Sequence, residues 1–297
     1  MLLQTSLVLQ GTLPSIESLP LDKAVCLGRT QSQLVSHFHK QTLRTLRAGM
    51  DDDALAVLRS TSGQGAGSFL ETPLDERYVM TNGRFTVACM RRLGDPWPGF
   101  ADKPRGPVAC NNTTATGRVC GQALDALGKH QECCAPGGGI IRRHDNMVRC
   151  IASAVSRTLD PKPRMEQVLP ELARLVMGHV EAGRMDVIVH SGAARHLVDA
   201  TIVSPLAGND AFRRGCARRD GHAARRAECV KRARYATPDL VPFAVETGGR
   251  LGTAARAFIM KCAEASEDPA KERVYLYRAI SSTLQDGIAR QLETPGL

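Results

Sequence analysis

The segment CNNTTATGRVCGQALDALGKHQECC, from Cys110 to Cys134, most constrains the fold, because it gathers four cysteines and one histidine. Three thiolates and one imidazole are the ligand set of a closed, tetrahedral structural zinc site. Cys110, Cys120 and His130 are candidate ligands, and Cys133 and Cys134 are alternatives for the fourth position. Zinc held by four protein ligands has no open position for water, so the pattern predicts a knuckle that stabilises a short segment.

The alternative to a zinc site is a group of reduced cysteines, buried as small hydrophobic side chains. The gap of nine residues between Cys110 and Cys120 favours this alternative, because paired zinc ligands are usually about two to four residues apart. The chain has ten cysteines, and its start, MLLQTSLVLQG, lacks the basic flank of a secretory signal. We therefore expect a nuclear or cytoplasmic protein, in a reducing compartment where cysteines stay free or bind metal.

Length and charge limit the class of protein. A chain of 297 residues with 43% hydrophobic residues is long enough for about two domains of roughly 150 residues. No stretch approaches the roughly 20 apolar residues of a membrane span. The net charge of +9 and the isoelectric point near 9.2 fit a polyanionic partner, because basic side chains that neutralise phosphates release condensed counterions.

The spacing of apolar residues divides the chain into four segments. Leucine and phenylalanine recur at helical spacing in residues 30–60, which predicts a helical hairpin. We therefore expect a helical N-terminal segment over residues 1–60, a linker segment over 61–104, the knuckle over 105–145 and a folded domain over 146–297.

The last segment combines helical and strand patterns. Apolar residues at helical spacing predict a helix over 144–157, which two prolines then end. Two runs rich in valine and isoleucine flank the glycine turn HSGAAR, which predicts a β-hairpin. The expected elements after the first helix are the strands 185–189 and 197–203, a helix over 207–235, a strand over 241–246 and helices over about 252–265 and 270–291.

Two aspartates lie on the predicted hairpin. Asp186 is on its first strand and Asp199 on its second, with 12 residues between them. Pairing across the turn would bring both carboxylates to one face of the sheet. Two carboxylates held close together repel, and a hard cation such as Mg²⁺ relieves that repulsion. The alternative is that one aspartate ends a strand or pairs with a nearby arginine.

A series of short segments follows in a fixed order over about residues 60–260. They are GQGAGSFLETPLDERYVMTNGRFTVACMRRLGDPWP, then VCGQALDALGKHQECCAPGGGIIRRHD, then VLPEL, GRMDVIV, LVDATIV, AECVKRARY and PFAVETGGRLG. In order and spacing they resemble LINE-type retrotransposon proteins, especially those of protist retroelements. In that family a cysteine–histidine knuckle and an Arg-His motif precede a restriction-enzyme-like endonuclease domain.

The resemblance implies an α/β fold of the restriction-endonuclease type, with a mixed sheet flanked by helices. A small zinc knuckle and a helical N-terminal segment would precede it. Family spacing places the last cysteine four residues after the histidine, which favours Cys134 over Cys133. Asp186 and Asp199 match the two acids of the nuclease motif, although Met185 stands where a proline is usual. No YxDD polymerase signature occurs, so we expect a C-terminal fragment.

The catalytic lysine is where the chain departs from the restriction-type pattern. That pattern has a lysine two residues beyond the second acid, and Thr201 stands there. The retrotransposon family instead has a KxxKY-like element on the next helix, where AECVKRARY supplies Lys231 and Tyr235, with Arg234 in place of a second lysine. Arginine keeps the charge but donates no proton near neutrality. Lys231 is the candidate for the cation that stabilises the transition state, and a solvated helix face is the alternative.

Basic residues form two candidate contacts with nucleic acid. In the family the Arg-His pair opens a helix beside the knuckle, which carries over to Arg143 and His144. A guanidinium and an imidazole near a helix N-terminus form an anion site. A second region, residues 213–234, holds nine lysines and arginines and would lie along a duplex backbone without reading sequence. Its expected phosphate contacts are Arg225, Arg226 and Arg232, and a solvated helix is the alternative.

Together these features predict a metal-dependent DNA endonuclease module of a LINE-type retroelement. It would nick one DNA strand so that the exposed 3′ hydroxyl primes reverse transcription. The expected partners are DNA and, as a second candidate, the element's RNA. The expected metals are structural zinc and catalytic magnesium. The alternative is a zinc-stabilised nucleic-acid-binding remnant without catalytic activity.

Overall fold

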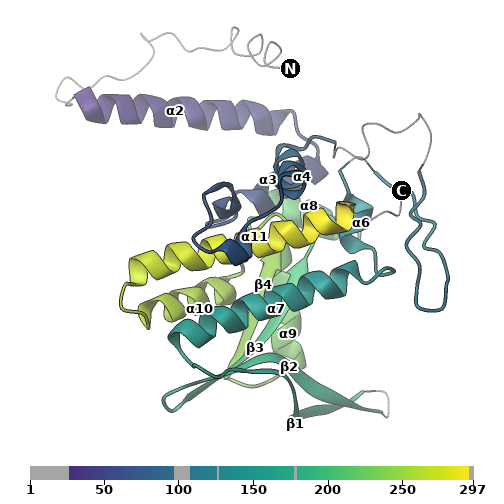
Figure 1. The fold of residues 1–297 in the computed structure, drawn as a ribbon. Helices are drawn as coiled ribbons and strands as arrows, with labels where there is room; N and C mark the ends of the chain where they lie inside the picture. The colour runs from purple at the N-terminus through teal and green to yellow at the C-terminus, as the bar shows by residue number, and fades with distance from the viewer. Residues whose placement is uncertain (1–26, 97–107, 126, 177–178, 294–297) are drawn as a thin grey trace. The chain divides into compact units, whose positions relative to one another are not determined.

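The computed structural model describes residues 27–96, 108–125, 127–176 and 179–293 (Figure 1). The start MLLQTSLVLQG and the end of the GDPWP stretch lie outside the described residues. The chain divides into two compact units, Met1–Met50 and Asp51–Leu297. Each unit is described by itself. No helix in the described ranges is both long and apolar enough to cross a membrane.

Two helices confirm the predicted helical N-terminal part. Helix α2 spans Leu27–Ala48 and belongs to the first unit, whereas α3 spans Asp52–Thr61 and belongs to the second. Asp51 begins α3, because its carboxylate accepts a hydrogen bond of 2.7 Å from the backbone N–H of Ala54. Within the second unit α3 packs against α8 (Asp210–Arg218).

The second unit is built on a four-stranded mixed sheet in the order β1-β2-β3-β4. The strands are β1 (Arg164–Val176), β2 (His179–Ser191), β3 (Ala194–Val203) and β4 (Leu240–Glu246). β1 and β2 are antiparallel, β2 and β3 are antiparallel, and β3 and β4 are parallel. This sheet confirms the predicted mixed sheet, including the hairpin, which turns at Gly192 with φ of +58°.

Strand β1 was not predicted, because its sequence argues against a strand. Pro170 lies inside it, and proline donates no hydrogen bond to a ladder. The strand is at the edge of the sheet, and its register shifts between Leu169 and Arg174 around this proline. Edge position and irregularity explain how the sheet accommodates Pro170.

Helices cover both faces of the sheet (Figure 1). One face, with Val187, Val198 and Phe243, packs into a single buried cluster with apolar residues of α7, α10 and α11. The other face, with Ile188 and Leu197, packs against Tyr235 at the end of α9. Helix α9 itself packs against β3 and β4. The bounds of these helices are Gly139–Thr158 for α7, His222–Arg234 for α9, Thr253–Glu264 for α10 and Pro269–Glu293 for α11. The flanking helices confirm the predicted α/β layers.

The helix predicted over 207–235 is two helices, α8 and α9. Helix propensity alone favours a continuous helix in this alanine- and arginine-rich stretch. The chain leaves α8 at Arg219 and begins α9 after Gly221, whose φ is +66°. That left-handed conformation is accessible to glycine without steric cost and interrupts a right-handed helix.

Residues 61–104, expected as a linker, include a further helix, α4 (Asn82–Leu93), and two short 3₁₀ helices. Thr81 begins α4 by accepting a hydrogen bond from the backbone N–H of Arg84. The helix packs along α11, which makes this region part of the second unit.

Two buried carboxylates fix the position of α9. Glu246, at the end of β4, accepts a hydrogen bond of 3.1 Å from the backbone N–H of Ala224 in the first turn of α9. Glu228, further along α9, accepts one of 2.9 Å from Ala254 in the first turn of α10. Helix N-termini carry unpaired N–H groups and a positive dipole end, so each carboxylate joins a helix to its neighbour. These contacts hold α9, the helix whose Lys231 reaches Asp199.

Candidate metal centres and nucleic-acid interface

Cys110, Cys120, His130 and Cys134 come together in the structure. Their four ligand atoms all lie within 4.8 Å of one another. The Sγ atoms of Cys110 and Cys134 are 3.7 Å apart, and Cys120 Sγ is 3.5 Å from His130 Nε2. Ligands about 2.3 Å from a zinc ion sit about 3.8 Å apart at the corners of a tetrahedron, whereas a disulfide needs about 2.05 Å. The cluster therefore has the ligands and the size of a structural zinc site.

An irregular two-stranded ribbon carries the first two ligands. Cys110 and Gln122 are joined by a hydrogen bond of 2.8 Å between backbone N–H and carbonyl, and Cys120 and Asn112 by another of 2.8 Å. The ribbon brings Cys110 and Cys120 together despite the long gap between them in the sequence. The nine residues between Cys110 and Cys120, whose number favoured free cysteines over zinc, therefore form the turn of this ribbon.

A short helix, α6 (Lys129–Cys133), carries the histidine. The carboxylate of Asp125 accepts hydrogen bonds from the backbone N–H groups of Leu127, Lys129 and His130, each of 3.0 Å. Sequence analysis missed Asp125, although an aspartate a few residues before a helix is a capping signal.

The fourth position is filled by Cys134, which is buried, while Cys133 is exposed and outside the cluster. Asn112 donates from Nδ2 to Cys134 Sγ over 3.4 Å. Burial raises the pKa of the Cys134 thiol to about 12. A buried thiol opposite a second thiol and an imidazole becomes a thiolate when it binds a metal cation. The three thiols and one imidazole, their number and the distances between them fit a zinc site with four protein ligands.

The second site lies where strands β2 and β3 separate. Their ladder begins at Ser191 and Ala194 beside the turn and its last pair is Val187 with Val198. Beyond that point β2 pairs only with β1, and β3 only with β4. Asp186 and Asp199 are the next residues on the two strands, so they occupy the apex of the opening. Extending the register makes them cross-strand neighbours on one face of the sheet.

The side chain of Asp186 makes a hydrogen bond to β3 where the backbone ladder between β2 and β3 has ended. Its Oδ2 accepts a hydrogen bond of 2.7 Å from the backbone N–H of Ala200, and it lies 3.4 Å from His144 Nε2. Hydrogen bonding to Asp186 raises the pKa of His144 above its ordinary value. Burial acts to raise the pKa of Asp186, but His144, the Ala200 N–H and Lys231 together hold it below its ordinary value. Asp186 is therefore ionised at neutral pH.

Asp199 is 4% exposed, and among the described residues only one of its two carboxylate oxygens has a hydrogen-bond partner. Lys231 Nζ on α9 lies 2.7 Å from Asp199 Oδ1. The other oxygen, Oδ2, is buried and has no hydrogen-bond partner among the described residues. Burial raises the pKa of Asp199, Lys231 opposes the rise and Asp186 adds to it. An unpaired, buried carboxylate oxygen beside a second carboxylate is a position that a divalent cation fits.

Two other residues assigned by resemblance are packed inside the protein. Tyr235 is 5% exposed and lies in the apolar cluster with Ile188 and Leu197. Arg143 is 3% exposed, and its guanidinium donates to Gln291 Oε1 over 2.6 Å and to the Glu132 carbonyl over 3.2 Å. Arg143 thereby joins α7 to α11 and to the knuckle, and these two hydrogen bonds occupy both terminal nitrogens of its guanidinium. His144 contacts Asp186 and does not pair with Arg143 as an anion site.

The arginines of α9 have a different environment from Arg143. Arg225, Arg226 and Arg232 are exposed on the outer face of the helix, while Lys231 points inward to Asp199. The Arg226 guanidinium also lies over the ring of Phe212, 5.2 Å from its centroid. One helix thus presents arginines to solvent and a lysine to the two carboxylates. A cavity of about 410 Å³ lies beside Lys231 and Thr201, and its walls are mostly apolar.

Comparisons with known proteins identify no family for this chain. The chain matches no protein-family model, and no curated protein matches it.

Proposed function

We propose that the protein is a metal-dependent DNA endonuclease module related to LINE-type retroelements, with a restriction-endonuclease-like core. The observation that carries the proposal is the unpaired, buried Oδ2 of Asp199 beside Asp186, with Lys231 on the same carboxylate. The resemblance of the segments around Asp186, Asp199 and Lys231 to the nuclease domain of that family supports it. Magnesium is the cation that we propose for this position, and zinc is the one for the knuckle.

Each group near the carboxylates has a role in this proposal. A bound magnesium ion would polarise a phosphate oxygen and lower the pKa of a bound water. Asp186 and Asp199 would hold the cation, and His144 keeps the Asp186 carboxylate oriented and ionised. Lys231 stabilises the negative charge that develops on the phosphate. The exposed arginines of α9 hold the DNA backbone without reading its sequence.

A nicking assay on supercoiled plasmid with magnesium tests the proposal. Asp186→Asn and Asp199→Asn should each abolish nicking and leave duplex binding in place, because the carboxylates hold the metal and the arginines hold the backbone. Asp145→Asn is the matched control, since Asp145 contacts His144 but not the two carboxylates. Nicking that survives in both aspartate variants would refute the proposal.

The second candidate is a zinc-stabilised nucleic-acid-binding protein without catalysis. The ion pair between Lys231 and Asp199 favours it, because an amine already neutralises the carboxylate that would hold the cation. Manganese titration followed by electron paramagnetic resonance separates the two candidates. Binding that disappears in Asp199→Asn supports the nuclease, whereas no binding by the wild-type protein supports the second candidate.

A further inference from the structure

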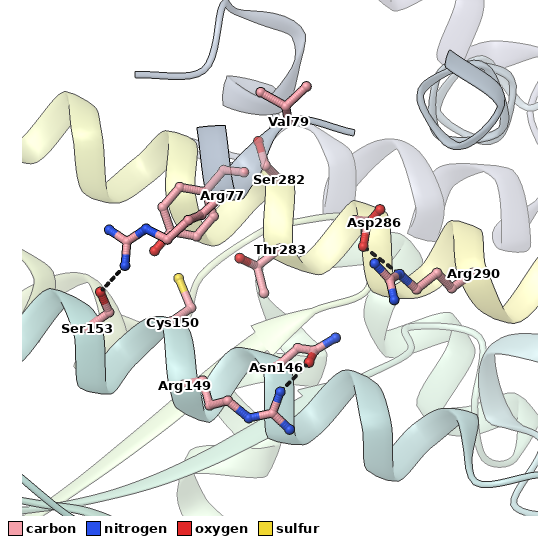
Figure 2. A pocket seen from close by; sticks show the side chains of 11 residues that line it. Arg77, Val79, Asn146, Arg149, Cys150, Ser153, Ser282, Thr283, Asp286 and Arg290 are labelled. Atoms are coloured by element: carbon pink, nitrogen blue, oxygen red, sulfur yellow. Dashed lines mark hydrogen bonds and ion pairs between the residues drawn. The ribbon is translucent and has the colours of Figure 1, made fainter. Parts of the chain in front are cut away.

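An arginine-lined groove lies between α7 and α11. Two cavities, of about 400 Å³ and 220 Å³, share Asn146, Arg149 and Arg290 as lining residues and so adjoin each other, and together they are called the groove. Figure 2 shows the larger cavity, with dashed lines joining Arg149 to Asn146 and Arg290 to Asp286. The arginines that line the two cavities are Arg77, Arg142, Arg143, Arg149 and Arg290.

The charge of the groove is strongly positive. Asp286 is the single acidic residue among the lining residues, and its carboxylate is already paired with Arg84 at 3.2 Å and with Arg290 at 2.8 Å. Arg142 and Arg149 are exposed, and within the described part of the chain neither forms an ion pair. Two arginines without carboxylate partners attract an anion, and a planar guanidinium matches a phosphate in geometry.

The groove is separate from the candidate catalytic site, although both use α7. His144 points from α7 to Asp186 on the sheet. A different face of α7 carries Arg142, Asn146 and Arg149. Their spacings of four and three residues place them along one side of the helix. That face lines the groove with α11. Two different faces of one helix therefore serve the two sites.

The dimensions of the groove fit one strand of nucleic acid. Helices α7 and α11 pack directly against each other, at an expected distance of about 8–10 Å between axes, so the hollow along their contact takes one sugar–phosphate backbone and not the full width of a duplex. Arg142 and Arg149 are seven residues apart, which is about 10 Å along the helix axis. They would contact different phosphates of a strand that runs along α7. Asn146 lies between them on α7, and Ser153 and Thr283 add hydroxyl groups to the lining of the larger cavity.

We propose that the groove between α7 and α11 binds the phosphate backbone of a single nucleic-acid strand. This site is additional to the duplex contact on α9 and does not depend on catalysis at Asp186 and Asp199. The shared chemistry is a chain of phosphodiesters, which RNA and DNA strands both supply.

The test is fluorescence anisotropy of the full chain with labelled single strands of about 12 nucleotides, a length within the range of about 4–16 that single-strand sites cover. Arg142→Glu combined with Arg149→Glu should weaken binding at least about tenfold and lower the salt slope by about 1.4, since each phosphate contact on a single strand contributes about 0.7. RNA and DNA probes in parallel identify which strand binds more tightly.

Matched variants keep the test specific. Arg273→Glu makes the same substitution at a single residue of α11, which is exposed and lines neither cavity, and it should leave single-strand binding unchanged; Arg142→Glu alone is the variant of equal charge change. Arg142→Gln with Arg149→Gln should weaken binding in the same direction and by less. Zinc content and circular dichroism establish that each variant is folded.

The remaining outcomes would overturn the proposal. The first is single-strand binding by the double glutamate variant that equals the wild type, and the second is an equal loss in Arg273→Glu. Loss of duplex binding alone in the double variant would place a duplex on this face. Loss of single-strand binding in Asp186→Asn, measured without added magnesium, would place the strand at the carboxylates. Failure of nicking leaves the groove proposal standing, because its measurements require no cleavage.

Discussion

Lys231 Nζ lies 2.7 Å from Asp199 Oδ1, although 32 residues separate the two in sequence. The restriction-type pattern places its lysine two residues after the second acid, where this chain has Thr201. Here an amine reaches the same carboxylate from α9, which Glu246 and Glu228 hold in position. In the proposed nuclease, Lys231 on α9 would take the role that the restriction-type pattern gives to a lysine on the strand.

Replacing Lys231 tests whether this lysine takes part in catalysis. We expect Lys231→Ala to lower the nicking rate by about 10² to 10³, the typical effect of removing one preorganised electrostatic donor. Arg232→Ala, at the exposed neighbouring position, should leave the single-turnover rate near that of the wild type once DNA is saturating. Equal rates for Lys231→Ala and the wild type would assign Lys231 to structure only.

Adjacent cysteines provide an internal control for zinc. Purified wild-type protein should carry about one equivalent of zinc, and Cys134→Ser should lose it, because Cys134 belongs to the cluster. Cys133→Ser should keep it, because Cys133 is exposed and lies outside the cluster. Metal analysis by mass spectrometry measures both. A zinc content unaffected by Cys134→Ser would contradict the tetrahedral assignment.

The exposed arginines of α9 should determine the salt dependence of duplex binding. Changing Arg225, Arg226 and Arg232 to Glu should weaken binding about equally for unrelated sequences, because phosphate contacts carry no base information. The slope of log K against log salt should fall by about 0.9 for each contact that is lost. Titrations at several salt concentrations give this slope, and an unchanged slope would mean that these arginines are only solvated.

Asp160 should make stability depend on pH in the acidic range. Its carboxylate accepts hydrogen bonds of 2.9 Å from the backbone N–H groups of His190 and Lys162, and these bonds, the His190 one first, lower its pKa below the ordinary value of 3.8. Because folding lowers this pKa, the stabilisation is complete above the unfolded pKa and is lost as pH falls through the folded one.

The variant Asp160→Asn should therefore lower the free energy of unfolding by about 1–3 kcal/mol near neutral pH. The difference between wild type and variant should shrink below about pH 4. Urea denaturation at a series of pH values measures it. A difference that stays constant down to pH 3 would show that the carboxylate charge is not involved.

Local chemistry in the sequence determined the elements with strong patterns. Valine and isoleucine around the HSGAAR turn predicted the β2–β3 hairpin, because alternate side chains of such a run fill one sheet face. Soft ligands between Cys110 and Cys134 predicted the cluster of three cysteines and one histidine, because few other roles require that set of side chains. Both predictions depend on residues close together in the chain.

Long-range packing decided what the sequence left open. The distance between Asp186 and Asp199 depends on where the β2–β3 ladder ends, and the approach of Lys231 depends on the carboxylates that hold α9. Arg143 is of a residue type that commonly contacts phosphates, but its guanidinium hydrogen-bonds to Gln291 and to the Glu132 carbonyl inside the protein. A side chain's type is fixed by the sequence, whereas its exposure and partners come from segments that only the fold brings together. Gln291, which is 148 residues along the chain, helps to enclose Arg143, while the neighbouring Arg142 is exposed.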